Sequence, residues 1–512
     1  MEKSKLSRRD ALKGVASLGL LAGASTLMAN ESPKAKDVKF DESYDVVVIG
    51  SGFAGLAASI RAAQRGNSVL MIEKMGRLGG NSVINGGVFT VVNSKKQKQE
   101  GIKDSKELFM KDCLKAGLNL NHKELLGTIA DRSHEALKIT LDCGAEYRPK
   151  LEHLGGHSVP RSYSTANGSG AGITIPMTKT LEGMKNVKIV RRTKFDDFVL
   201  DGDRVIGVVV REKYKFNPDL YSDDWENKSG KKKIIKANKG VILASGGFCR
   251  DKFYRQQQDP RLDPGYDSTN HPGATAGVLL KAFDIGATPV QVSWIQFGPW
   301  ACPDEKGFGT SAMFNVNGTF RYGISVDPRN GKRYMNELAD RKTRADAMFN
   351  MISTKDDIYP INICDDTPVQ NMLPVHRDKP IAAGVVKKFN TIDELAAYYK
   401  IPAKALKETI AKYNAGVKAG KDEMGKPVNM LGGATISKAP YYAVRGVPKL
   451  HHTMGGLKIN TKAQVISARN GKPIPGLYAA GEITGGTHGA SRLGSVAITD
   501  CLTFGMIAGE NV

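Results

Sequence analysis

Residues 44–74, YDVVVIGSGFAGLAASIRAAQRGNSVLMIEK, decide the fold of this chain. The run 45–49 is short, apolar and β-branched, which is typical of a buried parallel strand. Three glycines follow it with the spacing G-x-G-x-x-G: Gly50, Gly52 and Gly55. The Ala-rich stretch 54–66 then predicts a helix, and the apolar run 68–72 predicts a second strand.

The glycines and one acid indicate what this strand–helix–strand unit binds. The first glycine allows a tight turn, the second lets the backbone approach a pyrophosphate, and the third lets helix and strand pack closely. The helix N-terminus offers unpaired N–H groups to the phosphates. Glu73 ends the second strand roughly 20 residues further on, where a carboxylate accepts ribose hydroxyls. We therefore predict dinucleotide binding; the alternative is a glycine-rich turn of another α/β fold.

The composition is that of a globular protein with a sizeable core. The chain has 512 residues, 41% of them hydrophobic and 25% charged, enough for two or three domains. Its net charge of +22 fits a solvated basic surface, attraction of an anionic substrate or acidic redox partner, or both. The sequence contains neither a basic helix nor an array of basic and aromatic residues, so nothing in it indicates nucleic-acid binding. The six cysteines form no C-x-x-C or C-x-x-C-H, so no metal site or covalently attached haem is expected.

Residues 1–30 have the pattern of a twin-arginine signal peptide. Arg8 and Arg9 lie in SRRDALK, with Ala11 where an aromatic residue is common, and a weakly apolar run of small residues follows over 14–29. That run is too short to be a permanent membrane span. We therefore expect export of the folded, cofactor-loaded protein to the periplasm, with no integral membrane segment. The alternative is a basic N-terminal tail.

The rest of the chain predicts a dinucleotide-binding domain interrupted by an insertion. Further glycine-rich loops follow over 79–87, 168–172 and 244–247. Aromatic residues and amphipathic helices begin near residue 285, and the glycine-rich style returns near 441. We expect four segments along the chain: the signal over 1–30, a first part of the dinucleotide-binding domain over 42–284, an inserted domain over 285–440, and a second part of the first domain over 441–512.

Four motifs carry a resemblance to a known family: VVVIGSGFAG at 46–55, ASGGF at 244–248, HHTMGG at 451–456, and LYAAGEITGGTHGASRLG at 477–494. The chain resembles the flavoprotein reductases of the fumarate reductase and succinate dehydrogenase superfamily, most closely the soluble periplasmic flavocytochrome c branch. The resemblance covers nearly everything after residue 40. It implies an α/β fold: a discontinuous Rossmann-like FAD-binding domain with an inserted α+β capping domain that closes over the substrate.

The resemblance also implies which residues contact FAD. They are Gly50, Gly52, Ala54, Gly55, Glu73, Lys74, Gly80, Asn81, Ser82, Gly86, Gly87, Ala244, Ser245, Gly246, Gly481, Glu482, Ser495, Ala497 and Ile498. Membrane-bound relatives carry their covalent flavin on a histidine at the position of Ser82. Noncovalent FAD is therefore expected.

In the family, hydride passes from flavin N5 to one alkene carbon and an arginine of the cap protonates the other. The motif RYMNELADR at 333–341 makes Arg341 the expected acid, and His452 and Arg492 the expected carboxylate clamp. Arginine normally stays protonated, so it needs rapid proton resupply. The relay is left open among Arg321, Tyr322, Asp340 and Arg344. The alternatives are a surface ion pair of Arg341 with Glu337 and a structural role for His452.

Departures from the family motifs point to the substrate class. Gly298 and Trp300 stand where fumarate reductases carry the His and Thr of a His-Pro-Thr motif. The positions of the far-carboxylate ligands and relay Glu hold Asn315, Val316 and Thr319. A second carboxylate would be buried there without a partner, which costs heavily. We predict a substrate pocket of Gly298, Trp300, Val316, His452 and Arg492, with Phe297 beside it, that suits an apolar tail.

These inferences predict a periplasmic FAD-dependent reductase of a monocarboxylic 2-enoate such as methacrylate, acrylate or an aryl acrylate. There is no second fingerprint for NAD and no haem motif, so a separate periplasmic c-type cytochrome is the expected electron donor, in anaerobic respiration. Four alternatives stay open: a fumarate reductase, a urocanate reductase, an FAD-dependent 3-ketosteroid-type dehydrogenase, and a non-catalytic exported flavoprotein.

Overall fold

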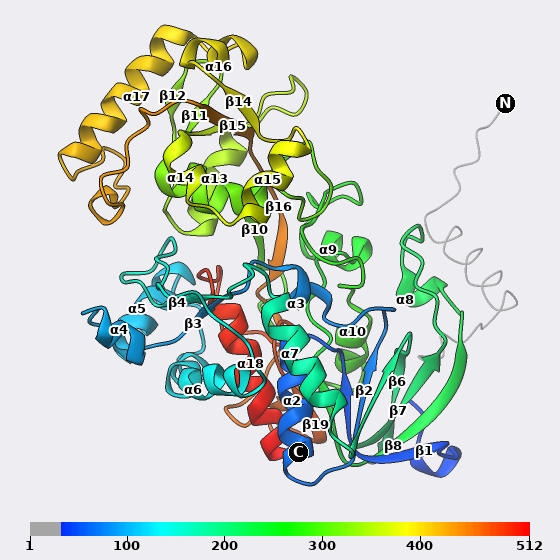
Figure 1. Cartoon of the computed structure of the whole chain (residues 1–512). Coiled ribbons are helices and arrows are strands. Elements are labelled where there is room, and N and C mark those ends of the chain that lie inside the picture. Colours follow the sequence, from blue (N-terminus) through cyan, green and yellow to red (C-terminus); the bar gives the residue numbers. More distant parts are fainter. Residues whose placement is uncertain (1–31) are drawn as a thin grey trace, which may run out of the picture.

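The computed structural model of the chain describes residues 32–512, which form two units, one above the other in Figure 1. The predicted signal at 1–30 lies outside the described residues. An antiparallel pair of strands, β10 (Ile295–Ala301) and β16 (Val447–Thr453), links the two units. No helix within residues 32–512 combines the length and apolar character that a bilayer span requires.

The lower unit is organised on an eight-stranded sheet with the order β18-β19-β8-β1-β2-β5, with β7 also paired to β8 and β6 to β7. The pairs of β1 with β2 and β8 are parallel, as are β2–β5 and β8–β19. Val46, Val47 and Val48 of β1 are fully buried, as expected for a parallel strand covered on both faces. The strands of this sheet are β1 (Glu42–Ile49), β2 (Val69–Glu73), β5 (Val187–Arg191), β6 (Lys194–Asp201), β7 (Arg204–Glu212), β8 (Lys231–Leu243), β18 (Gln464–Ile466) and β19 (Pro473–Ala479).

Two helices from opposite ends of the chain, α2 (Phe53–Gln64) and α18 (Val496–Asn511), pack together against this sheet (Figure 1). A Cβ on Gly505 would lie 2.5 Å from the backbone oxygen of Ala54, so glycine is required there. The other helices of the unit are η1 (Ala35–Asp37), α3 (Gly80–Ile84), α4 (Lys95–Gln99), α5 (Lys106–Ala116), α6 (Lys123–Asp142), α7 (Ala171–Glu182), α8 (Asp223–Glu226), α9 (Lys252–Gln258) and α10 (Gly277–Asp284). Short pairs join β3 (Val88–Thr90) to β4 (Ser162–Ser164) and β9 (Pro289–Val290) to β17 (Gly456–Leu457).

The upper unit has its own antiparallel sheet, in the order β12-β11-β13-β15-β14, and its own apolar core. Its strands are β11 (Ile324–Asp327), β12 (Lys332–Arg333), β13 (Ile361–Cys364), β14 (Lys387–Phe389) and β15 (Tyr441–Arg445). Its helices are α11 (Ala312–Phe314), the π-helix η2 (Asn315–Thr319), α12 (Phe320–Tyr322), α13 (Arg341–Met351), α14 (Asp366–Gln370), α15 (Pro374–Ala382), α16 (Ile392–Tyr398), α17 (Ala403–Lys418) and η3 (Val428–Met430). Helices packed on an antiparallel sheet make this an α+β insertion.

The sheet pairing does not coincide with the segment boundaries expected at 285 and 440. Strand β15 pairs with β13 and β14, so the sheet of the upper unit continues to Arg445. Strand β9 lies after residue 285 but pairs with β17 of the lower unit. The boundaries are hidden in the sequence because β15 and β16 form one extended run interrupted only by Gly446. The division into domains itself stays a prediction.

Candidate active site

The three glycines after β1 build a turn that has no room for side chains. Gly50 has φ +107°, and a Cβ there would lie 2.4 Å from the backbone oxygen of Ala244. A Cβ on Gly55 would lie 2.0 Å from the backbone oxygen of Gly50, so the third glycine packs α2 on the turn. A Cβ on Gly52 would lie 2.9 Å from Ser82 Oγ. The turn therefore presents backbone N–H groups at the start of α2, as a phosphate site requires.

Glu73 lies beside this turn at the end of β2 and is held in place by three hydrogen bonds. Its carboxylate accepts hydrogen bonds from the hydroxyl of Ser51 (2.6 Å), the N–H of Ser51 (3.3 Å) and the N–H of Met75 (2.8 Å). Burial raises the pKa of Glu73 above its ordinary value. The side chain lines the same cavity as Gly50 and Gly52, where a ribose would meet it.

Two adjoining cavities run from this turn to the upper unit, which we call the cap. The nucleotide cavity, about 100 Å³, is lined by the glycine turn, Glu73 and the loops 79–82, 244–246 and 480–482. The reaction cavity, about 180 Å³, extends to side chains of the cap, including Trp300 and Arg341. The two cavities share five lining residues: Phe53, Asn81, Ser82, Glu482 and Cys501. Two joined cavities, one at the glycine turn and one reaching the upper unit, fit the two halves of FAD.

Most of the predicted FAD contacts line these cavities. The predicted contacts that line the nucleotide cavity are Gly50, Gly52, Ala54, Glu73, Gly80, Asn81, Ser82, Ala244, Ser245, Gly246, Gly481 and Glu482. Among the predicted contacts, the reaction cavity takes Asn81, Ser82, Gly86, Glu482, Ser495, Ala497 and Ile498.

Three of the predicted contacts line neither cavity. Gly55 packs α2 on the turn, and Gly87 packs on Thr165, whose Oγ1 would lie 2.3 Å from an added Cβ. Lys74 points away, because its Nζ donates to Thr275 Oγ1 over 2.6 Å and lies 3.4 Å from Asp224 Oδ1.

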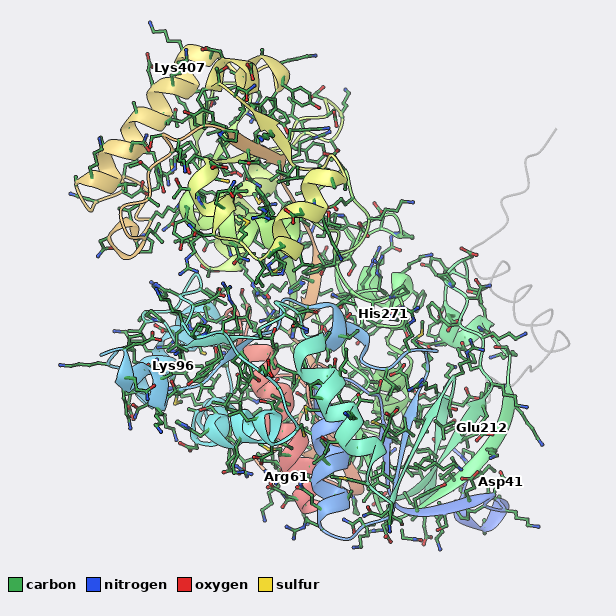
Figure 2. The ribbon with its side chains drawn as sticks, in the orientation of Figure 1. Asp41, Arg61, Lys96, Glu212, His271 and Lys407 are labelled. Carbon is green, nitrogen blue, oxygen red and sulfur yellow. The ribbon has the colours of Figure 1, made fainter. Side chains whose placement is uncertain are left out.

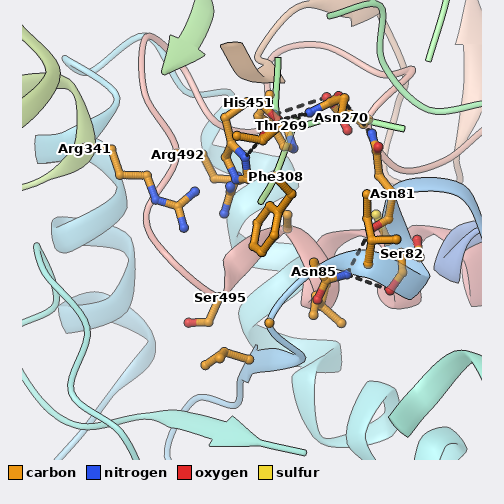
Figure 3. A pocket seen from close by; sticks show the side chains of 18 of the residues that line it. Asn81, Ser82, Asn85, Thr269, Asn270, Phe308, Arg341, His451, Arg492 and Ser495 are labelled. Atoms are coloured by element: carbon orange, nitrogen blue, oxygen red, sulfur yellow. Dashed lines mark hydrogen bonds and ion pairs between the residues drawn. The ribbon is translucent and has the colours of Figure 1, made fainter. Parts of the chain in front are cut away.

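Arg341 and Arg492 point into the reaction cavity from different units (Figure 3). Arg341 begins α13 of the cap, and Arg492 follows β19 in the lower unit. Neither guanidinium has a carboxylate in salt-bridge range within residues 32–512, although Arg492 is buried. Burial lowers the pKa of Arg492 to about 10. Burial and the charges of Arg492 and Arg344 lower the pKa of Arg341 well below its ordinary value. Two such cations make a site for an anion.

Gln296 of β10 connects the two arginines. Its Oε1 accepts a hydrogen bond from Arg341 Nη1 over 3.1 Å. Its Nε2 donates to the backbone oxygen of Arg492 and to Ser491 Oγ, each over 2.8 Å. In the strand pair that joins the units, Gln296 lies opposite His452. One buried amide in the link between the units therefore ties the side chain of Arg341 to the backbone at Arg492.

His452 is buried beside Glu482 near Arg492. Its Nδ1 lies 3.9 Å from Glu482 Oε1 and has no hydrogen-bond partner in the described part of the chain. Burial, followed by the charge of Arg492, lowers the pKa of His452 well below its ordinary value, so the ring is neutral at pH 7. Burial also raises the pKa of Glu482 to about 7, although a hydrogen bond from the N–H of Thr453 acts to lower it. A neutral ring with an unpaired nitrogen is free to hydrogen-bond a ligand.

Trp300 covers Gly298 and forms one wall of the reaction cavity. A Cβ on Gly298 would lie 3.0 Å from Cζ2 of the indole, so the ring fills the space that a side chain at 298 needs. The Arg341 guanidinium carbon lies 4.5 Å from the centre of the indole ring, a cation–π contact. Gly298 itself does not line the cavity, contrary to the prediction, because Trp300 lies in front of it.

The expected apolar wall is present but differs in one member. Val316 lines the cavity, and Met313 and Phe308 lie there too. Phe297 does not line the cavity; it packs on Phe349 at a ring distance of 4.9 Å.

The ion pair weighed as an alternative role for Arg341 is not observed. The carboxylate of Glu337 is held instead by Arg333 Nη2 over 2.7 Å and approached by Lys426 at 3.5 Å. Of the residues considered for a relay, Asp340 caps α13 and Arg321 lies 3.9 Å from Glu152, away from the cavity.

Several lining residues were not predicted. His451 donates to or accepts from Thr269 Oγ1 over 2.7 Å, and Asn270 bonds both Asn81 (2.9 Å) and the backbone oxygen of His451 (2.7 Å). His451 stands in the quoted HHTMGG motif, which could have suggested it. His271, at the top of the lower unit in Figure 2, lines the nucleotide cavity without any such signal.

The fold and these cavities define a flavoprotein of the FAD-binding type. The family described as FAD binding domain matches residues 45–498, and the chain belongs to this family. The chain is an FAD-dependent oxidoreductase, and the predicted resemblance and α/β fold are confirmed.

Three comparisons describe its relatives. The chain is 43% identical over 510 residues to the acrylate reductase flavoprotein subunit of Shewanella woodyi, covering 99% of this chain and 98% of that protein. It is 34% identical over 473 residues to the urocanate reductase of Eggerthella lenta, covering 91% and 74%. It superposes on the open conformation of a flavocytochrome c3 fumarate reductase with a TM-score of 0.70 and 28% identity, covering 100% and 82%.

Proposed function

We propose that this protein reduces the C=C bond of a monocarboxylic 2-enoate, such as acrylate, methacrylate or an aryl acrylate. One observation carries the proposal: two arginines that have no carboxylate partner in the described part of the chain converge on a cavity whose cap-side wall is otherwise apolar. The charge of one substrate carboxylate would be compensated there. The 43% identity to an acrylate reductase flavoprotein subunit supports the same substrate class.

FAD, when bound noncovalently in the two cavities, supplies a hydride for one alkene carbon. Arg492 holds the substrate carboxylate by charge-assisted hydrogen bonds, and the neutral ring of His452 adds a further hydrogen bond. Arg341 gives a proton to the other alkene carbon. Its depressed pKa makes this transfer easier than from an ordinary guanidinium. Trp300 and Gln296 keep the guanidinium of Arg341 in position for that transfer.

The same geometry argues against fumarate as the main substrate. Asn315, which stands at a far-carboxylate position, is engaged within the cap: its Nδ2 donates to the backbone oxygen of Trp300 over 2.8 Å, and its Oδ1 accepts from Thr319 over 2.7 Å. A second carboxylate beside Trp300 and Val316 would lose its hydration without gaining partners.

Electrons are proposed to come from a separate c-type cytochrome in the periplasm. The relative from Shewanella woodyi is named a flavoprotein subunit, which supports a partner that delivers electrons. The twin-arginine pattern at Arg8 and Arg9 supports export.

The test is reoxidation of the reduced, FAD-loaded protein. The protein is reduced with a viologen dye, and its reoxidation is followed with acrylate, methacrylate, cinnamate, urocanate and fumarate. We expect at least one monocarboxylic enoate to react faster than fumarate. Faster reaction with fumarate than with every monocarboxylate would overturn the proposal.

A further inference from the structure

A loop of the cap presents one aromatic side chain to the reaction cavity. The loop connects β10 to α11 and contains Gly307-Phe308-Gly309. Figure 3 shows the ring of Phe308 between Arg492 and His451 on one side and Asn85 on the other, where it lines the reaction cavity. The side chain is half-buried and packs against the apolar cluster that contains Trp300. Its position at the loop tip was not apparent from the sequence.

The base of the loop is fixed by Glu305. The carboxylate of Glu305 accepts four hydrogen bonds: from the N–H and hydroxyl of Thr310, each over 2.6 Å, and from the N–H and hydroxyl of Ser311, over 3.1 and 2.6 Å. These bonds close the segment 305–311 into a ring with Phe308 at its tip. A Cβ on Gly309 would lie 2.4 Å from Glu305 Oε2, so this closure requires glycine.

A second anchor ties the loop to the rest of the molecule. The N–H of Gly307 donates to Asp267 Oδ2 over 2.9 Å, and the buried Lys449 lies 2.8 Å from the same oxygen. Lys449 Nζ also donates to the backbone oxygens of Glu305 and, over 3.3 Å, Gly307. Gly307 and Gly309, on either side of Phe308, have φ of +66° and +68°, a conformation that glycine adopts without strain. The loop is therefore built to hold Phe308 where it is.

We propose that Phe308 is a specificity-determining residue that closes the substrate end of the reaction cavity, so that short enoates fit and aryl acrylates are excluded. The inference rests on the proposed function and narrows its substrate class. The cavity of about 180 Å³ must take the reactive end of the cofactor as well as the substrate. Trp300, Met313 and Val316 bound the remaining space, and the anchored ring of Phe308 fills what a phenyl tail would need.

The test compares Phe308→Ala with the unaltered FAD-loaded protein. In the unaltered protein we expect kcat/KM for cinnamate to be at least about 100-fold below that for acrylate. Phe308→Ala is expected to raise the ratio of cinnamate to acrylate at least about tenfold. Phe308→Leu should raise this ratio by less. This variant replaces Phe308→Ala in the test if the alanine variant does not fold. Phe253→Ala is the matched control, because Phe253 packs on Trp225 and lines neither cavity.

A second measurement separates this proposal from the proposed function. Propionate and 3-phenylpropionate are titrated into the oxidised protein, and binding is read from the flavin absorbance without turnover. We expect the unaltered protein to bind propionate alone and Phe308→Ala to bind both acids. Two outcomes would show that Phe308 does not set the selectivity. In the first, Phe308→Ala and Phe308→Leu have the selectivity of the unaltered protein in both assays. In the second, the unaltered protein binds 3-phenylpropionate as well as propionate. Binding with this pattern but no enoate turnover would overturn the proposed function and leave the role of Phe308 standing.

Discussion

Two sets of buried arginines in this molecule have opposite surroundings. Arg161 in the lower unit lies 2.9 Å from Asp104 and 2.6 Å from Asp112, and Arg333 in the cap lies 2.7 Å from Glu337 and 2.5 Å from Asp422. Burial alone would lower the pKa of these arginines, but the hydrogen bonds and charges of their acidic partners outweigh it and raise the pKa.

Arg341 and Arg492 have no such partners among residues 32–512, and burial lowers the pKa of both. The difference distinguishes arginines that stabilise the fold from arginines that are available to a ligand. Arg161 and Arg333 are paired within their own units, whereas the pairing of Arg341 and Arg492 is what a site for an anionic ligand would leave open.

The largest expected effect is on turnover. Arg341→Lys should lower kcat about 10²- to 10⁴-fold, because an ammonium cannot reproduce the fork of guanidinium N–H groups that contacts Trp300 and Gln296 and so places the donated proton. Steady-state reduction of acrylate by viologen measures it, with bound FAD checked by absorbance. Arg329→Lys is the control, since Arg329 pairs with Asp327 at the cap surface. Near-normal kcat in Arg341→Lys would remove Arg341 from the role of acid.

The next effect is on stability, and it should differ between the acid-paired arginines and those at the reaction cavity. Arg161→Met should lower the free energy of unfolding by about 3–5 kcal/mol, because Asp104 and Asp112 would be left buried without their cation. Arg492→Met should change it by less than about 1 kcal/mol, since no carboxylate loses a partner. Urea denaturation with FAD in excess measures both. Equal losses in the two variants would contradict the distinction.

A smaller effect is expected on ligand affinity. Arg492→Met should weaken propionate binding to the oxidised protein about 30-fold, the equivalent of about 2 kcal/mol for a lost charged partner. Titration followed by flavin absorbance measures it. Arg329→Met should bind propionate normally, and unchanged affinity in Arg492→Met would show that the carboxylate lies elsewhere.

The smallest effect is a pH dependence. Burial raises the pKa of Glu482 to about 7, so its carboxyl is neutral below that pH and ionised above it. Ionisation adds a negative charge near the anion site, and propionate affinity should therefore fall about threefold to tenfold as pH rises through 7. Glu482→Gln should flatten the profile. A profile that rises with pH would contradict this sign.

Much of the lower unit could be predicted because its constraints are local. The glycine turn, Glu73 and the apolar strands follow from the sequence spacing, and each lies where that spacing implies. Lys74 could not be placed, because the direction of a side chain just after a strand depends on Asp224 and Thr275, far along the chain.

The cap was harder to predict because its contacts are distant in sequence. Strand β10 pairs with β16, and β15 belongs to the cap sheet although it follows residue 440. Trp300 was recognised as a pocket residue, but its position over Gly298 depends on that strand pairing. Phe308 was missed since nothing local shows that Glu305 closes a loop under it.

The packing of α18 on α2 has a consequence for synthesis. Arg61 of α2, labelled in Figure 2, lies 3.6 Å from Met506 of α18, 445 positions later in the chain. A Cβ on Gly505 or Gly509 would lie 2.5 or 2.3 Å from a backbone oxygen of α2, so the two helices are in close backbone contact there. The packing of α2 on α18 can therefore be completed only after nearly all of the protein has been made. Because residues 480–482 also line the nucleotide cavity, that cavity is complete only after this late stretch has been made.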